Sequence, residues 1–206
     1  MKIAVLGATG RTGRLVCAEL DRRGHEVVAV VRDAARAPER TTPVVGDVRD
    51  GDTLRRAVAG ADAVVSALGP VKGEKHLHAT VAPALVAAMG AAEVRRFIGV
   101  SGAGVDAPGD RKRTRDRLIS KAMSTFGGAM VGDKTAELQV MADSDLEWTL
   151  VRPPRLTDGP ATGDVEHDAH VSTRSTAITR ADLAVFVADV LDQGLYVRQA
   201  PFVACR

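Results

Sequence analysis

The sequence contains few aromatic residues and few cysteines, and both shortages narrow the classes of protein that it can represent. Aromatic residues make up 3% of the 206 residues, as four Phe, one Trp and one Tyr. Proteins that bind single-stranded nucleic acid stack bases on aromatic side chains, so this composition argues against such a role. The two cysteines, Cys17 and Cys205, have neither metal-binding nor redox spacing and favour a reduced, cytoplasmic protein.

The sequence also lacks a strong excess of charge and a long apolar run. Its 28 Lys and Arg residues nearly balance its 26 Asp and Glu residues, and a net charge of +2 is too small to indicate a nucleic acid or membrane partner. No apolar run is long enough to span a bilayer, and the first strand begins at Lys2, which leaves no room for a signal peptide. The length and the 45% hydrophobic content fit one globular α/β domain with a full core.

The most informative segment is residues 2–15, where a strand runs into a turn of spacing G-x-x-G-x-x-G that opens a helix. Gly7 allows a sharp turn off the strand, Gly10 lets a pyrophosphate approach the backbone, and Gly13 lets the helix pack close to the sheet. The first helical N–H groups and the positive end of the helix dipole then face the phosphates. An ordinary tight turn is the alternative, but the flanking strand and helix favour a dinucleotide site. The expected contacts are Gly7, Thr9, Gly10, Arg11, Thr12 and Gly13.

Apolar strand patterns alternate with helical patterns along the whole chain. The predicted strands are Ile3–Leu6, Glu26–Val31, Val44–Val45, Asp62–Leu68, Arg96–Ser101, Glu147–Arg152 and one within Tyr196–Ala204. The predicted helices are Arg11–Arg23, Asp50–Ala59, Val81–Met89, most of Lys112–Asp143, and Asp182–Asp192. This alternation predicts a single Rossmann-like domain over residues 1–206, with a doubly wound parallel sheet in a three-layer αβα arrangement. Two long loops, Gly102–Asp110 and Pro153–His170, should line the substrate, because ligands bind beyond the carboxyl ends of the strands.

The residues after the second strand indicate which nicotinamide cofactor the site prefers. A carboxylate at that position binds the ribose 2′-OH of NAD, whereas an arginine accommodates the 2′-phosphate of NADP. Arg32 stands where the acid would stand, and Arg11 and Arg36 can reach the same region. Guanidinium groups bind a phosphate through forked, charge-assisted hydrogen bonds, so we expect NADP(H) in preference to NAD(H). In the alternative, Arg32 and Arg36 are solvated and Asp33 holds the ribose.

Two further strand ends are candidate cofactor contacts. Asp47 could accept a hydrogen bond from the adenine amino group while Val48 packs on the ring, but a turn or capping role for Asp47 is equally compatible with the sequence. Leu68 and Gly69 end the fourth strand, where a glycine lets the ribose pass close to the backbone. Gly69 can equally serve the Gly-Pro turn.

Four segments occur in an order that matches a known family: the glycine turn, Val31-Arg32-Asp33, Gly46-Asp47-Val48 and Val151-Arg152-Pro153-Pro154. Together they resemble the atypical short-chain dehydrogenase/reductases with an NAD(P)H-binding fold. The resemblance covers essentially the whole chain, and is greatest to the branch that holds biliverdin-IXβ reductase/flavin reductase and NmrA-like proteins. It also implies a cofactor contact at Pro153.

The resemblance further implies catalytic residues, because the family uses a serine after the fifth strand and a Tyr-x-x-x-Lys pair on the next helix. Ser101 and Lys134 match the serine and the lysine, whereas Met130 stands at the tyrosine position. A thioether cannot donate a proton, so acid catalysis by a tyrosine is in doubt here. In the alternative, Ser101 only caps a turn and Lys134 is an exposed lysine that pairs with an acid.

The flavin-reductase branch also lacks the tyrosine, and there a serine and a histidine border the substrate. Gly102 and Arg155 match those positions. Arg155 could hold a carboxylate or phosphate of the substrate, or pair with Asp158.

Three polar clusters have less specific patterns. The acids and histidines of 164–170 match no metal-binding motif, so we expect a solvated hairpin and no metal. His76 and His78, with Lys72 and Lys75, could form a basic lid, but a solvated loop is favoured. The charged run 110–117 has no interleaved aromatic residue and predicts a charged helical face.

These observations predict an NADPH-dependent reductase that transfers hydride to a small or planar acceptor such as a flavin, quinone or bilin. Ser101 would orient or polarise the acceptor, and Lys134 would support the ribose or a proton relay. The alternative is a non-catalytic redox sensor of NmrA type, which the methionine at the tyrosine position favours. We expect a small molecule as the only partner, and a monomer or homodimer.

Overall fold

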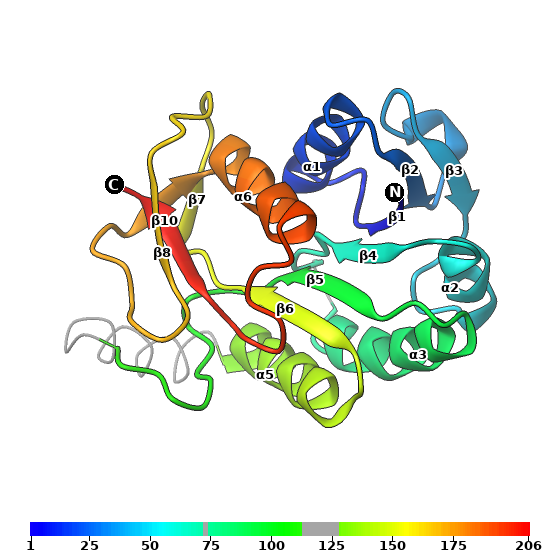
Figure 1. Cartoon of the computed structure of the whole chain (residues 1–206). Coiled ribbons are helices and arrows are strands. Elements are labelled where there is room, and N and C mark those ends of the chain that lie inside the picture. Colours follow the sequence, from blue (N-terminus) through cyan, green and yellow to red (C-terminus); the bar gives the residue numbers. More distant parts are fainter. Residues whose placement is uncertain (72–73, 113–127) are drawn as a thin grey trace.

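The computed structural model describes residues 1–71, 74–112 and 128–206, and a six-stranded parallel sheet forms its centre (Figure 1). The strand order β3-β2-β1-β4-β5-β6 is that of a doubly wound sheet. The sheet contains β1 Lys2–Leu6, β2 Glu26–Val31, β3 Thr42–Val45, β4 Ala63–Ser66, β5 Arg96–Val100 and β6 Glu147–Val151. The helices are α1 Arg11–Arg22, α2 Gly51–Val58, α3 Leu77–Ala91, α5 Gly128–Asp143 and α6 Arg180–Asp192, with a 3₁₀ turn at Ala34–Arg36. The predicted fold is confirmed.

The alternation of side chains along each strand produces two separate cores. Ile3 and Val5 point to one face of the sheet and pack with α1 and α6, whereas Ala4 and Leu6 point to the other face and pack with α2, α3 and α5. All four side chains are fully buried. The central strands therefore read as continuous apolar runs, because helices cover both of their faces. Trp148 on β6 is buried in the second core, as its position in an apolar strand predicts.

In the described part of the chain, four short strands lie outside the central sheet, and the sequence predicts only the last of them, β10, as the strand within Tyr196–Ala204. β7 (Arg155–Thr157) pairs in parallel with β9 (Ala177–Thr179), and β8 (Val165–Asp168) pairs antiparallel with β10 (Phe202–Cys205). The prediction of a loop over 153–170 is wrong for β7 and β8. β7, β8 and β9 have three or four residues and no long apolar run, so the sequence gives little sign of them, and each is formed by pairing with a distant segment.

Two helices begin earlier than their patterns predict, for different reasons. α3 begins at Leu77 instead of Val81, because the Asp133 carboxylate on α5 accepts hydrogen bonds from the backbone N–H groups of His78 (2.9 Å) and Ala79 (2.8 Å). α6 begins at Arg180 instead of 182, because Thr179 caps it. The predicted helix over 112–143 is confirmed for 128–143, while 113–127 lie outside the described residues.

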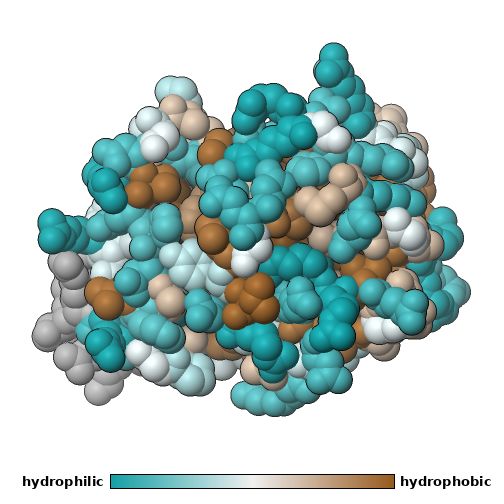
Figure 2. Space-filling view, in the orientation of Figure 1, coloured by the Kyte–Doolittle hydropathy of each residue, from teal (hydrophilic) through white to brown (hydrophobic). Residues whose placement is uncertain are grey.

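Polar and charged side chains cover most of the face shown in Figure 2, and the hydrophobic residues on it lie in small separate groups. Among the described residues, no helix combines the length and the apolar character that a membrane span needs. The predicted monomer or homodimer stays a prediction.

Both cysteines are free thiols, and burial raises the pKa of Cys17 to about 12.

Arg152, directly after β6, is the largest of the fully buried side chains. Its guanidinium forms a forked ion pair with Asp110, with Nη1 2.6 Å from Oδ2 and Nη2 2.7 Å from Oδ1. The same group donates to the carbonyls of Val105 (2.9 Å) and Ala200 (2.7 Å) and lies 3.8 Å from the centre of the Phe202 ring. One side chain thus joins the end of β6, the loop 102–110 and the last strand.

Replacing Arg152 with methionine should strongly destabilise the protein, because the Asp110 carboxylate would stay buried without its partner. We expect Arg152→Met to lower the free energy of unfolding by roughly 3–5 kcal/mol in urea titrations. The control is Arg95→Met, since the Arg95 side chain is 68% exposed and lies 3.6 Å from Glu147. This control should change the free energy by about 1 kcal/mol or less. Similar losses in the two variants would contradict the assigned role of Arg152.

Candidate cofactor and substrate site

Two cavities lie side by side at the carboxyl ends of the central strands, where a doubly wound sheet binds its ligands. Their volumes are about 450 and 660 Å³, and we call them the smaller and the larger cavity. The residues that line both are Arg11, Thr12, Ala67, Leu68, Gly69, Pro70, Leu156 and Arg180. The shared wall makes one continuous site large enough for an extended ligand and a second molecule.

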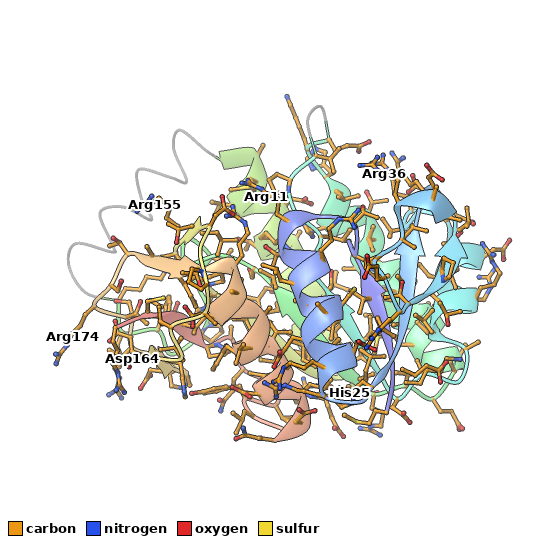
Figure 3. All side chains as sticks on the ribbon, turned by 90° about the horizontal axis from the view of Figure 1, so that it is seen from above. Arg11, His25, Arg36, Arg155, Asp164 and Arg174 are labelled. Carbon is orange, nitrogen blue, oxygen red and sulfur yellow. The ribbon has the colours of Figure 1, made fainter. Side chains whose placement is uncertain are left out.

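The smaller cavity brings together most of the predicted cofactor contacts. Ten of them line it: Gly7, Thr9, Gly10, Arg11, Thr12, Arg32, Asp47, Val48, Leu68 and Gly69. Gly13 lies behind the turn, where it packs on Gly7. Arg36 lines neither cavity, and in the view of Figure 3 Arg11 lies between Arg36 and Arg155. That these predicted residues contact a cofactor stays a prediction.

The glycine turn has the geometry of a phosphate cradle. Gly7 has a φ of +74°, which is a left-handed conformation that favours glycine. A Cβ on Gly13 would lie 2.1 Å from the Gly7 carbonyl oxygen, so α1 can approach β1 this closely only with glycine there. A Cβ on Gly10 would meet only that same oxygen, at 3.2 Å, and would otherwise project into open space. Gly10 lines the smaller cavity, so the residues present fit a dinucleotide pyrophosphate on the first turn of α1.

The far end of the smaller cavity contains one arginine without an ion pair. Arg32 lines this end and forms no ion pair or hydrogen bond with another described residue. Asp33, the alternative ribose ligand, accepts a hydrogen bond from the Ala35 N–H at 3.0 Å and caps the 3₁₀ turn. Asp47 is bound by Arg49, with Oδ2 2.7 Å from Nη2, and this contact lowers the pKa of Asp47 to about 2. The carboxylates of Asp33 and Asp47 thus already have hydrogen-bond donors, and the Arg32 guanidinium is available to bind an anion.

Two arginines occupy the junction of the cavities and share one carboxylate. Arg180, whose side chain is 10% exposed, lies 2.7 Å from Asp158, and Arg11 lies 3.6 Å from the same residue. Asp158 is therefore not the partner of Arg155, which has no ion pair within the described part of the chain. Arg180 is a residue of this site that was not predicted from the sequence. The spacing Thr179-x-x-Asp182 is a capping-box pattern and could have placed Arg180 in the first turn of α6.

The larger cavity contains every predicted catalytic and substrate residue. Pro153, which the resemblance assigned to the cofactor, also lines it, and so does Met130, the residue at the tyrosine position. Apolar groups make up much of the wall, and include Leu68, Val100, Val105, Val131, Leu156 and Phe202. The predicted residues that line it are Ser101, Gly102, Lys134, Pro153 and Arg155. Their roles in binding or catalysis stay predictions.

Lys134 is buried at the base of the larger cavity and is not the exposed lysine of the alternative interpretation. Its Nζ donates hydrogen bonds to the Val100 carbonyl (2.7 Å) and to Glu137 Oε2 (3.0 Å). Burial lowers the pKa of Lys134, and the Glu137 carboxylate opposes this change. Burial alone would raise the pKa of Glu137, but Lys134 and His78 hold it below its ordinary value. Ser101 Oγ has no partner among the described residues, so it does not cap the turn.

The polar clusters of the sequence are placed differently from their predictions. His78 is 3% exposed and lines the larger cavity, so the prediction of a solvated loop is wrong for this residue. Lys72 and part of the 110–117 run lie outside the described residues. The 164–170 segment is not a separate hairpin, because β8 pairs with β10, and His167 Nδ1 lies 2.6 Å from Tyr196 Oη. The described residues contain no grouping of His, Cys, Asp and Glu suited to a metal ion.

Replacing Gly10 with valine should abolish dinucleotide binding and leave the protein folded. The new side chain would project into the space that a pyrophosphate needs, while its Cβ meets only one backbone oxygen at 3.2 Å. Calorimetric titration with NADPH measures the loss, and circular dichroism checks the fold. Gly90→Ala on the exposed side of α3 is the control, since a Cβ there meets nothing within 4 Å. Normal NADPH binding by a folded Gly10→Val protein would show that the cradle is misplaced.

Comparisons with known proteins agree with this geometry. A family model described as NAD(P)H-binding matches residues 7–194. The Bacillus subtilis protein YwnB is 30% identical over 203 residues, which cover 93% of this chain and 92% of that protein. A 3-diazoavenalumate denitrifying reductase from a Streptomyces species is 34% identical over 178 residues, which cover 79% of this chain and 58% of that enzyme.

A solved structure with the same fold is a candidate NADH-flavin reductase from Streptococcus pneumoniae TIGR4. It superimposes with a TM-score of 0.84 at 24% identity and covers 100% of both chains. The family model spans the glycine turn, the whole of α6 and every residue that lines the two cavities except Phe202. The chain therefore belongs to the NAD(P)H-binding family and has a Rossmann fold.

Proposed function

We propose that the protein is an NADPH-dependent reductase that transfers a hydride to a planar, conjugated acceptor. The observation that carries this proposal is the wall that the two cavities share. A dinucleotide with its pyrophosphate at Gly10 and its adenosine near Val48 would extend past Leu68 and Gly69 into the larger cavity. A bound nicotinamide supplies the hydride there. The larger cavity leaves room for a second, apolar molecule against that ring.

The preference for NADPH rests on Arg32. This side chain stands at the position that distinguishes the two cofactors, and it has no ion pair among the described residues. The nearest carboxylates are already used, since Asp33 caps a turn and Asp47 binds Arg49. A 2′-phosphate would give Arg32 a charge-assisted partner that NADH does not have.

The choice of acceptor rests on what the larger cavity contains. Met130, which lines it and is 44% exposed, takes the place of the phenol that protonates an alkoxide in related reductases. The apolar side chains and the Phe202 ring in the wall suit a flat ring system, and Arg155 could hold an anionic substituent of the substrate. The Streptomyces relative is named as a reductase, which agrees with this class of reaction. Positioning of donor and acceptor would supply most of the catalysis.

Removing Arg32 should reduce the affinity for NADPH without changing the affinity for NADH. Loss of a charge-assisted hydrogen bond costs roughly 1.5–3 kcal/mol, which corresponds to a tenfold or greater rise in Kd. Calorimetric titration of Arg32→Ala and wild type with both cofactors measures this difference. Arg40→Ala serves as a control, because the Arg40 side chain is 80% exposed and pairs with Asp21. Equal affinities of the wild-type protein for NADPH and NADH would contradict the preference.

The wild-type protein should reduce conjugated acceptors much faster than simple ketones. Flavins and quinones delocalise the incoming electron pair, whereas an aliphatic ketone needs a proton donor at its oxygen, and a missing general acid costs about 10²–10⁴-fold in rate. Steady-state NADPH oxidation with a flavin, a quinone and an aliphatic ketone gives the comparison. Faster turnover of the ketone would contradict the proposed acceptor class. Tight NADPH binding with no turnover of any acceptor would instead support a redox sensor.

A further inference from the structure

The wall of the larger cavity contains two polar side chains whose buried polar atoms form no hydrogen bond within the described part of the chain. Both ring nitrogens of His78 and the hydroxyl of Ser101 lack a hydrogen bond. Buried polar groups in proteins are nearly always hydrogen-bonded, because an unpaired one costs about 1–3 kcal/mol. Both residues line the same cavity, so a polar group of the bound substrate is the partner that would satisfy them.

The backbone of His78 is held rigidly, and its side chain lies against a carboxylate. Asp133 on α5 accepts the His78 backbone N–H at 2.9 Å, which fixes the first turn of α3. One turn further along α5, Glu137 Oε1 lies 3.7 Å from His78 Nδ1. Glu137 Oε2 accepts a hydrogen bond from Lys134 at 3.0 Å, so the carboxylate itself is fixed in place.

The side chains of His78, Glu137 and Lys134 therefore form one buried cluster at the substrate cavity. Their exposed fractions are 3%, 4% and 8%. The charged groups that contact His78 come from α5: Asp133 at its backbone and Glu137 beside its ring. Lys134 is paired with the second oxygen of Glu137. A carboxylate beside one nitrogen of an imidazole orients the ring, which leaves the opposite nitrogen free to face a ligand and donate a proton to it.

We propose that His78, supported by Glu137, donates the proton that completes reduction of the acceptor, in place of the tyrosine that Met130 replaces. The inference rests on the proposed reductase function. In the step, an uncharged acceptor gains a hydride from the reduced nicotinamide and a proton from His78 Nε2. The Nε2–H bond of His78 and one C–H bond of the bound dihydronicotinamide would break, and two new bonds to hydrogen would form on the acceptor. The dihydronicotinamide would thereby be oxidised, and the neutral His78 ring would take a proton from water.

Lys134 is less suited to this role, although it matches the family's lysine. Its ammonium group already donates to the Val100 carbonyl and to Glu137. Its contribution is to hold Glu137, and through Glu137 the His78 ring, so it acts as a positioning residue. Ser101 Oγ, which is also unpaired, would accept or donate a second hydrogen bond to the same acceptor.

Two acceptors that differ in their need for a proton test this proposal. A neutral quinone becomes a hydroquinone by taking one hydride and one proton, whereas the cationic dye methylene blue becomes its neutral leuco form by taking a hydride alone. Rates of NADPH oxidation are measured for wild type, His78→Asn and His78→Ala, with the uncatalysed rates subtracted. His76→Asn is the matched control, because His76 lies two residues earlier and is exposed.

We expect His78→Asn to lower kcat for the quinone by about 10²-fold or more and to change kcat for methylene blue by no more than about twofold. NADPH affinity should be unchanged, and free imidazole should restore quinone reduction by His78→Ala. Equal quinone rates in wild type and His78→Asn would overturn the proposal. So would equal losses for both acceptors without rescue by imidazole, which would show a structural role. A wild-type protein that reduces neither acceptor would overturn the reductase function, and this inference with it.

Discussion

The close approach of α1 to β1 at Gly7 and Gly13 is the contact on which the whole site depends. With a Cβ at Gly13 only 2.1 Å from the Gly7 oxygen, any other residue would push the helix away from the sheet. The first turn of α1 would then no longer present its N–H groups at the carboxyl end of β1, where the strand order of the parallel sheet reverses between β1 and β4. The turn itself consists largely of glycine, and the absence of side chains there leaves space for the cavities beside it.

On the opposite face of the sheet, α5 organises the substrate cavity with buried polar side chains in addition to its apolar ones. Asp133, Lys134 and Glu137 are all buried, and they reach respectively the start of α3, the end of β5 and the ring of His78. Burying three charges costs stability unless each has a partner, and here each does. We infer that the role of these buried charges is to fix the positions of the groups that they reach.

The sequence was sufficient to predict the elements that a local pattern determines. It was insufficient for the elements that depend on a residue far away in the chain. The β1–turn–α1 unit was predictable in detail, because apolar runs and glycine spacing express it within fifteen residues. The start of α3 was not, because its cap is the side chain of Asp133, more than fifty residues away. For the same reason His78 was predicted to be solvated, and Arg152 gave no sign of its four partners before the fold was known. Arg180 was different, since the Thr179–Asp182 spacing was readable from the sequence.

The contacts of Arg152 imply an order in which the site is completed as the chain leaves the ribosome. The glycine turn and the strands that line the smaller cavity are made first, and most of that wall comes from residues before 80. Arg152 and Asp110 can pair only after β6 is made, and the Ala200 carbonyl and the Phe202 ring arrive fifty residues later. Phe202 also lines the larger cavity. A nascent chain stalled before residue 200 would therefore have its nucleotide groove but not a closed substrate chamber, and would expose the apolar surface that β10 covers.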